Sequence, residues 1–139
     1  HRAIYKKRKD VNYIVHNQSP EVMAVSKTTK VMKPLLDDLA QLVGVTVKNA
    51  AFNPNSTLKS SKKVVRALKG RNGVLLANNG ALCVAGSEYD ATAVEMVMEK
   101  GCKAEVGKKL FGTGKPINPI ETRLMRFVYL QKYSKQAKK

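Results

Sequence analysis

A histidine and several amides stand at the ends of two apolar runs, where they could bind a ligand or take part in proton transfer. The first run leads into His16, one of only two histidines, and then into a polar cluster that includes Gln18. The second run, Val74–Ala77, stops at paired asparagines, the second of which is Asn79. Each pattern indicates a strand that delivers side chains to a site. An imidazole there can ligate a metal, transfer protons or form a structural hydrogen bond.

These two segments resemble the class II aldolase and adducin family, in which one apolar strand ends in His-x-His and a later one ends in Asn-His-Gly. Residues 1–11 resemble the helix and turn before the first of these strands, and residues 86–91 resemble the start of the helix after the second. The resemblance covers nearly the whole chain and is strongest over residues 1–26 and 70–105. It implies an α/β fold of three layers: a central, mainly antiparallel β-sheet covered by helices on both faces.

The family's three histidines bind a divalent metal, usually zinc, and the matching positions here are His16, Gln18 and Asn79. A catalytic zinc ion needs about three imidazole, thiolate or carboxylate ligands, and neutral amides are weak donors to it. The resemblance therefore implies a degenerate metal site, with zinc or another divalent metal only if that site is functional. We assign no catalytic or cofactor-binding residue, because the family's acid–base glutamate would lie just before His1.

The family's phosphate-binding loops lie further upstream and would also be missing. We therefore expect residues 1–139 to form a single domain of this type that is incomplete at its N-terminus. With 43% hydrophobic residues, the chain can build a core of its own.

The net charge is large, because 26 lysines and arginines face 10 acidic residues and give +16. Such a charge attracts anions. The basic residues are scattered along the sequence, however, and neither interleaved aromatics nor a zinc-finger pattern accompanies them. Lysine predominates, which is more typical of a solvated surface or of phosphate attraction than of base readout. Nucleic acid is therefore not the expected partner, whereas phosphorylated sugars are a partner that the resemblance implies.

Hydrophobic spacing, capping residues and turn residues predict an alternating series of elements. The final helix carries more apolar and aromatic surface than one-sided packing needs, and family enzymes are commonly tetramers, so we expect a homo-oligomer, most simply a tetramer. The basic tail beyond Ser134 should be frayed. The predicted helices span residues 1–8, 20–27, 33–43, 57–68, 88–110 and 119–134, and the predicted strands span 11–16, 45–47, 74–77 and 81–85.

Three further features have ordinary explanations. Gly112-Thr113-Gly114-Lys115 lacks the full spacing of a phosphate-binding loop and is expected to join two helices. Cys83 and Cys102 lie in contexts that suit buried free thiols in a reducing compartment. Because no apolar run is long enough to span a bilayer, we expect a cytoplasmic protein.

Three functions remain open at this point. The leading hypothesis is a class II aldolase-like binding or assembly module with little or no aldolase activity, comparable with the noncatalytic adducins. A metal-dependent sugar-phosphate aldolase (a lyase) or epimerase with an altered metal site is the second. A nucleic-acid-associated basic protein, supported by charge alone, is the third. Whether the chain is an enzyme is therefore left open.

Overall fold

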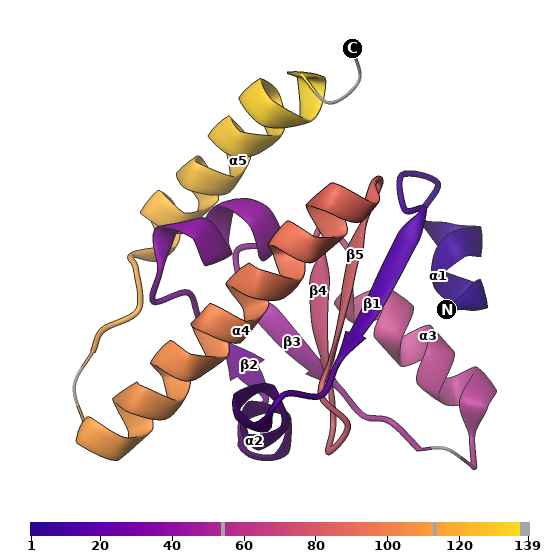
Figure 1. Ribbon diagram of the computed structural model, residues 1–139, viewed down its shortest axis with the longest axis horizontal. Helices are drawn as coiled ribbons and strands as arrows, with labels where there is room; N and C mark the ends of the chain where they lie inside the picture. Colours follow the sequence, from indigo (N-terminus) through magenta and orange to yellow (C-terminus); the bar gives the residue numbers. More distant parts are fainter. Residues whose placement is uncertain (54, 113, 137–139) are drawn as a thin grey trace.

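The computed structural model describes residues 1–53, 55–112 and 114–136 (Figure 1). Its centre is a five-stranded sheet with the strand order β1-β5-β4-β3-β2. Only β3 and β4 run parallel, and the other neighbouring pairs are antiparallel. The expected mainly antiparallel sheet is confirmed. The strands are β1 (Tyr13–Asn17), β2 (Val31–Met32), β3 (Val47–Ala50), β4 (Gly73–Leu76) and β5 (Ala81–Ala85).

Helices cover both faces of this sheet, as the three-layer expectation requires (Figure 1). Successive residues of a strand point to opposite faces, so Leu75 and Cys83 belong to one apolar cluster whereas Val74 and Val84 belong to the other. The first cluster includes residues of α2 (Pro20–Thr28), the π-helix η1 (Leu39–Val43) and α4 (Glu88–Phe111), and the second includes residues of α1 (Arg2–Lys7) and α3 (Thr57–Ala67).

The ends of the long helix follow the sequence signals. The hydroxyl of Ser87 accepts a hydrogen bond from the backbone N–H of Asp90 at 3.2 Å and so caps the start of α4. Gly112 ends the helix in the left-handed conformation, with φ of 66°. The expected loop follows, although Thr113 lies outside the described residues. The last helix, α5 (Pro119–Gln136), continues two residues past the predicted end, and the rest of the predicted frayed tail lies outside the described part of the chain.

The predicted helix over 33–43 is wrong in its first half. The carbonyl of Pro34 accepts a hydrogen bond from Ile117 N–H at 2.9 Å, so it does not start a helix. Helical backbone begins only at Asp37 and continues as η1, whose last bond joins Gly44 N–H to Leu39 O at 3.1 Å. This wide turn buries Leu39, Ala40 and Val43, which are three of the apolar residues that suggested a longer helix.

The predicted strand over 45–47 is displaced to Val47–Ala50. The carbonyl of Thr46 accepts a hydrogen bond from Arg71 Nε at 2.7 Å instead of pairing with a strand. The short strand β2, which has no counterpart among the predicted elements, pairs with β3.

Within the described ranges, no helix is both long and apolar enough to cross a membrane.

Arg8 fixes α1 against the rest of the molecule. Its guanidinium donates to the carbonyls of Leu68 and Arg71 at 2.9 and 2.7 Å, and it forms a salt bridge with Asp10 at 2.8 Å. Because hydrogen bonds to a charged group contribute about 1.5–3 kcal/mol, this side chain and the buried Ile4 together hold a short helix that could not persist alone.

We expect Arg8→Gln to lower the free energy of unfolding by about 1.5–3 kcal/mol, since the carbonyls lose a charged donor. Urea denaturation measures the change, and Lys9→Gln is the matched control because Lys9 is exposed and adjacent. The control should change stability by less than about 0.5 kcal/mol. Equal effects of the two substitutions would show that Arg8 does not anchor α1.

Candidate functional site

The sheet brings the two sequence segments together. Strand β1 pairs antiparallel with β5, with His16 opposite Leu82 and Asn17 opposite Ala81. Because Ala81 directly follows the turn that contains Asn79, the end of β1 lies beside that turn. His16 and Gln18 are two residues apart and share a side of the extended chain. The three residues singled out in the sequence are therefore neighbours.

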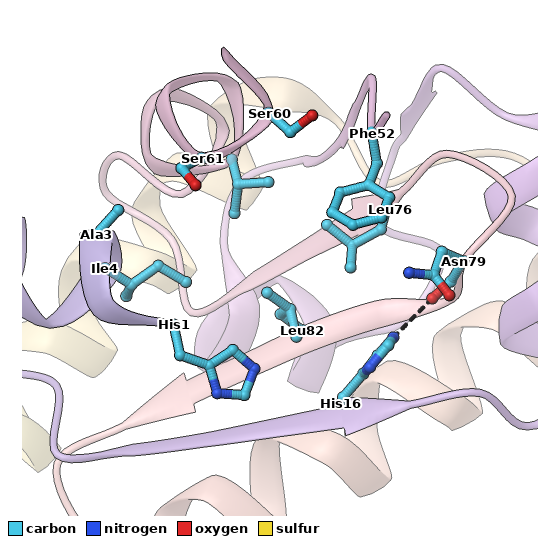
Figure 2. Close-up of a pocket in the computed structure, with 11 residues that line it drawn as sticks. His1, Ala3, Ile4, His16, Phe52, Ser60, Ser61, Leu76, Asn79 and Leu82 are labelled. Carbon is cyan, nitrogen blue, oxygen red and sulfur yellow. Dashed lines mark hydrogen bonds between the residues drawn. The ribbon is translucent and has the colours of Figure 1, made fainter. Parts of the chain in front are cut away.

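Asn79 binds both of the other two residues. Its backbone carbonyl accepts a hydrogen bond from His16 Nε2 at 2.7 Å (Figure 2). Its side-chain Oδ1 accepts a second bond from Gln18 Nε2 at 2.9 Å. A carbonyl oxygen can only accept, so the geometry assigns the proton of the neutral imidazole to Nε2.

Asn17 lies between His16 and Gln18 and points to the opposite side of the strand, where it is buried. Its amide donates to Glu95 Oε1 on α4 at 3.1 Å, and its Oδ1 accepts from Ser19 N–H at 2.8 Å. This residue fixes the chain where β1 ends. Sequence reasoning did not single out Asn17, although the alternation of side chains along the strand distinguishes it from its neighbours.

The turn that carries Asn79 is held by α2. Ser26, buried near the end of α2, accepts hydrogen bonds from the backbone N–H groups of Asn78 and Gly80, at 3.3 Å to its carbonyl and 3.2 Å to its hydroxyl. Asn78 and Gly80 both have positive φ, at 61° and 84°. Asparagine and glycine are the residues that tolerate this conformation best, which explains why the strand ends in Asn-Asn-Gly.

A small cavity of about 170 Å³ lies beside His16, between α1, α3 and the sheet (Figure 2). Leu76 and Leu82 form part of its apolar lining, and polar groups are contributed by His16, Asn79 and Ser61. The hydroxyl of buried Ser60, which also lines the cavity, is occupied by the backbone of Asn53. Sequence reasoning did not link α3 to this site, because no local pattern shows that this helix packs against β3 and β4.

The two cysteines cannot replace missing metal ligands at this site. Both are free and buried, Cys83 in β5 and Cys102 in α4. Burial raises the pKa of Cys102 to about 12, with a contribution from Glu105, and burial together with Glu95 raises the pKa of Cys83 further. Both side chains also belong to the apolar cluster with α2, η1 and α4, whereas the cavity beside His16 lies on the face of the sheet that α1 and α3 cover. Among the residues that the structure describes, no three histidine, cysteine or acidic side chains converge on one point.

Residues 1–106 match the family model described as the class II aldolase and adducin N-terminal domain. An L-fuculose phosphate aldolase of Escherichia coli O6:H1 is 32% identical to the chain over 89 residues, which are 63% of this chain and 41% of that protein. The chain thus spans less than half the length of this curated relative.

Solved structures share the fold. An L-fuculose 1-phosphate aldolase matches with a TM-score of 0.81 at 23% identity, over 90% of this chain and 58% of the other. YgbL of Klebsiella pneumoniae, described as a putative aldolase/epimerase/decarboxylase, matches with a TM-score of 0.79 at 20% identity, over 91% of this chain and 62% of the other. Both matches concern architecture, since their identities are low.

The site requires glycine at position 80, because there is no room for a side chain there. A Cβ there would lie 2.2 Å from the backbone oxygen of Asn17, and φ is already in the left-handed region. We expect Gly80→Ala to cost at least about 1–3 kcal/mol from the backbone conformation alone. Thermal and urea unfolding measure the loss.

The matched control is Gly107→Ala, where a Cβ on α4 meets nothing within 4 Å. Alanine should stabilise this helix by about 0.5–1 kcal/mol. A Gly80→Ala protein as stable as the Gly107→Ala protein would contradict the described turn.

Proposed function

This chain belongs to the class II aldolase and adducin family, and on that premise we propose that it is a binding or assembly module with a degenerate metal site and little or no aldolase activity. The observation that carries the proposal is the pair of hydrogen bonds by which Asn79 binds His16 and Gln18. These are the residues at the three positions where the family resemblance places metal ligands.

The donor set does not fit a zinc ion. Zinc requires a nitrogen lone pair from the imidazole, and because His16 Nε2 donates its proton to the Asn79 carbonyl, only Nδ1 keeps such a lone pair. The Oδ1 of Asn79 is engaged by Gln18, which leaves the Oε1 of Gln18 as a neutral and weak donor. Metal binding at His16 Nε2 and Asn79 Oδ1 would have to compete with these two hydrogen bonds and would gain only one imidazole and two amides in return.

A second function, a metal-dependent sugar-phosphate aldolase or epimerase with an altered metal site, has one observation in its favour. The cavity of about 170 Å³ beside His16 and Asn79 has an apolar lining and polar groups on its wall. Ligand pockets combine an apolar lining with a few such groups. This alternative requires ligands other than the residues now engaged by Asn79.

The degenerate site can be tested by restoring the ligands. We expect Gln18→His combined with Asn79→His to create a zinc site, because position 18 already contacts position 79 and His16 lies beside both. Micromolar zinc should then raise the melting temperature of the double variant, and chelator should reverse the rise.

The same double variant with His16→Ala is the matched control and should lose most of the zinc response. No gain in zinc affinity in the double variant would show that the three side chains cannot converge on a metal. Aldol cleavage by the wild-type protein in the presence of added zinc would support the second function instead.

We also propose a homo-oligomer, most simply a tetramer. The supporting observation is the apolar surface of α5, where Ile120 is 78% and Phe127 60% exposed. Leu110 and Phe111 at the end of α4 are also exposed. Ile120 and Phe127 are seven positions apart and so share a face of α5, and an exposed apolar helix face is typical of an interface.

Assembly should depend on salt. A tetramer would carry four times the charge of +16 per chain, and this repulsion is screened as ionic strength rises. We therefore expect light scattering to show larger particles at moderate than at low salt. The substitutions Ile120→Glu and Phe127→Glu should dissociate them, whereas Lys115→Glu, on the exposed loop before α5, should not. A wild-type monomer at both salt concentrations, well above micromolar protein, would refute the oligomer.

A further inference from the structure

The helices α1 and α3 pack side by side (Figure 1). Their side chains line an open groove of about 880 Å³. Five cationic side chains line it: Arg2, Lys6 and Lys7 from α1, and Lys62 and Arg66 from α3. These residues are 55 or more positions apart in the sequence across the two helices, so only the fold brings them together. Arg2 with Lys6, and Lys62 with Arg66, are four residues apart and share a face of their helix.

No acidic residue of either helix offsets these charges. The two helices contain seven lysines and arginines and neither aspartate nor glutamate. By contrast, α4 on the opposite face of the sheet carries five acidic residues and four lysines. The nearby Asp10 pairs with Arg8, which does not line the groove. Seven of the 26 basic residues therefore lie on two helices that contain no acidic residue.

Five positive charges in one groove repel one another unless an anion binds between them. Like charges four residues apart on a helix repel by a few tenths of a kcal/mol, and the repulsion adds across the groove. The ion pairs of the described residues are Arg8–Asp10 and Lys100–Asp38, and neither of them includes a cation of the groove. An elongated anion that lies along the groove would neutralise the cations of α1 and those of α3 together.

We propose that this groove binds the phosphate backbone of double-stranded nucleic acid. With a rise of 1.5 Å per residue, Lys62 and Arg66 lie about 6 Å apart along α3. A duplex strand has one phosphate per about 3.4 Å of axis, so these two cations face about two phosphates of one strand, and the cations of α1 face a similar number. A single phosphorylated sugar would engage only a part of the cationic rows.

The side chains of the groove distinguish duplex from single-stranded ligands. Nonspecific single-strand binding relies on aromatic side chains that stack on bases, and the residues that line this groove include none. Three of the five groove cations are lysines, which act as point charges towards phosphate and do not read bases by bidentate contacts. Binding should therefore be strongly salt-dependent and largely independent of sequence. This inference departs from the sequence-based expectation, which treated the basic residues as scattered, and it does not depend on the metal site.

Fluorescence anisotropy with a labelled 20-base-pair DNA duplex tests the groove, using the full 139-residue chain. If all five cations contact phosphates, the logarithm of the binding constant should fall with the logarithm of salt concentration with a slope of about −4.5. The triple variant Lys6→Gln, Lys7→Gln, Lys62→Gln should flatten that slope by about 2.7. The three lysines are exposed, so the variant should fold, and circular dichroism checks that it does.

The matched control is Lys27→Gln, Lys30→Gln, Lys103→Gln, which removes the same charge from exposed positions on α2, the following turn and α4. Its slope should stay close to that of the wild type. Equal loss in both triple variants would overturn the proposal, because it would assign binding to net charge rather than to the groove. Tighter binding of the matching single strand, or of polyglutamate with the same number of charges, would also overturn it.

Discussion

The pairing of β1 with β5 is the interaction on which the rest of the site depends. It places the end of β1 beside the β4–β5 turn, and a shift by one residue would exchange the two faces of β1. His16 would then point towards α4, and Asn17 would lose its bond to Glu95. The buried amide of Asn17 thus fixes the register and, through it, the position of His16.

The turn between β4 and β5, which lies beside the end of β1, is held in place by α2. Ser26 on α2 holds the backbone on either side of Asn79, and Gly80 lets that backbone pass close to the carbonyl of Asn17. The end of β1 and the β4–β5 turn therefore meet at a cluster of hydrogen bonds, which the imidazole of His16 and the amides of Gln18 and Asn79 form. We propose that these bonds satisfy the polar groups that a metal would otherwise bind, so that the family scaffold is kept without its metal chemistry.

Much of this could be predicted from local signals. The polar ends of two apolar runs located His16, Gln18 and Asn79, and Ser87 marked the start of α4 through its capping hydroxyl. The predictions were wrong where a hydrogen bond from a residue distant in the sequence fixes the backbone conformation. Ile117 binds the carbonyl of Pro34, and Arg71 binds that of Thr46, so residues 33–47 depart from their local pattern. The basic groove was not visible for the same reason, since its two rows come from separate helices.

The central claim is that His16 uses Nε2 as a hydrogen-bond donor and not as a metal ligand. Nitrogen-15 NMR of the imidazole, recorded at neutral pH before and after one equivalent of zinc, tests it most directly. We expect the resonance of a protonated Nε2 in the metal-free protein, unchanged by zinc. A zinc-induced shift of Nε2 to the position of a metal-bound nitrogen, at stoichiometric metal, would contradict the claim.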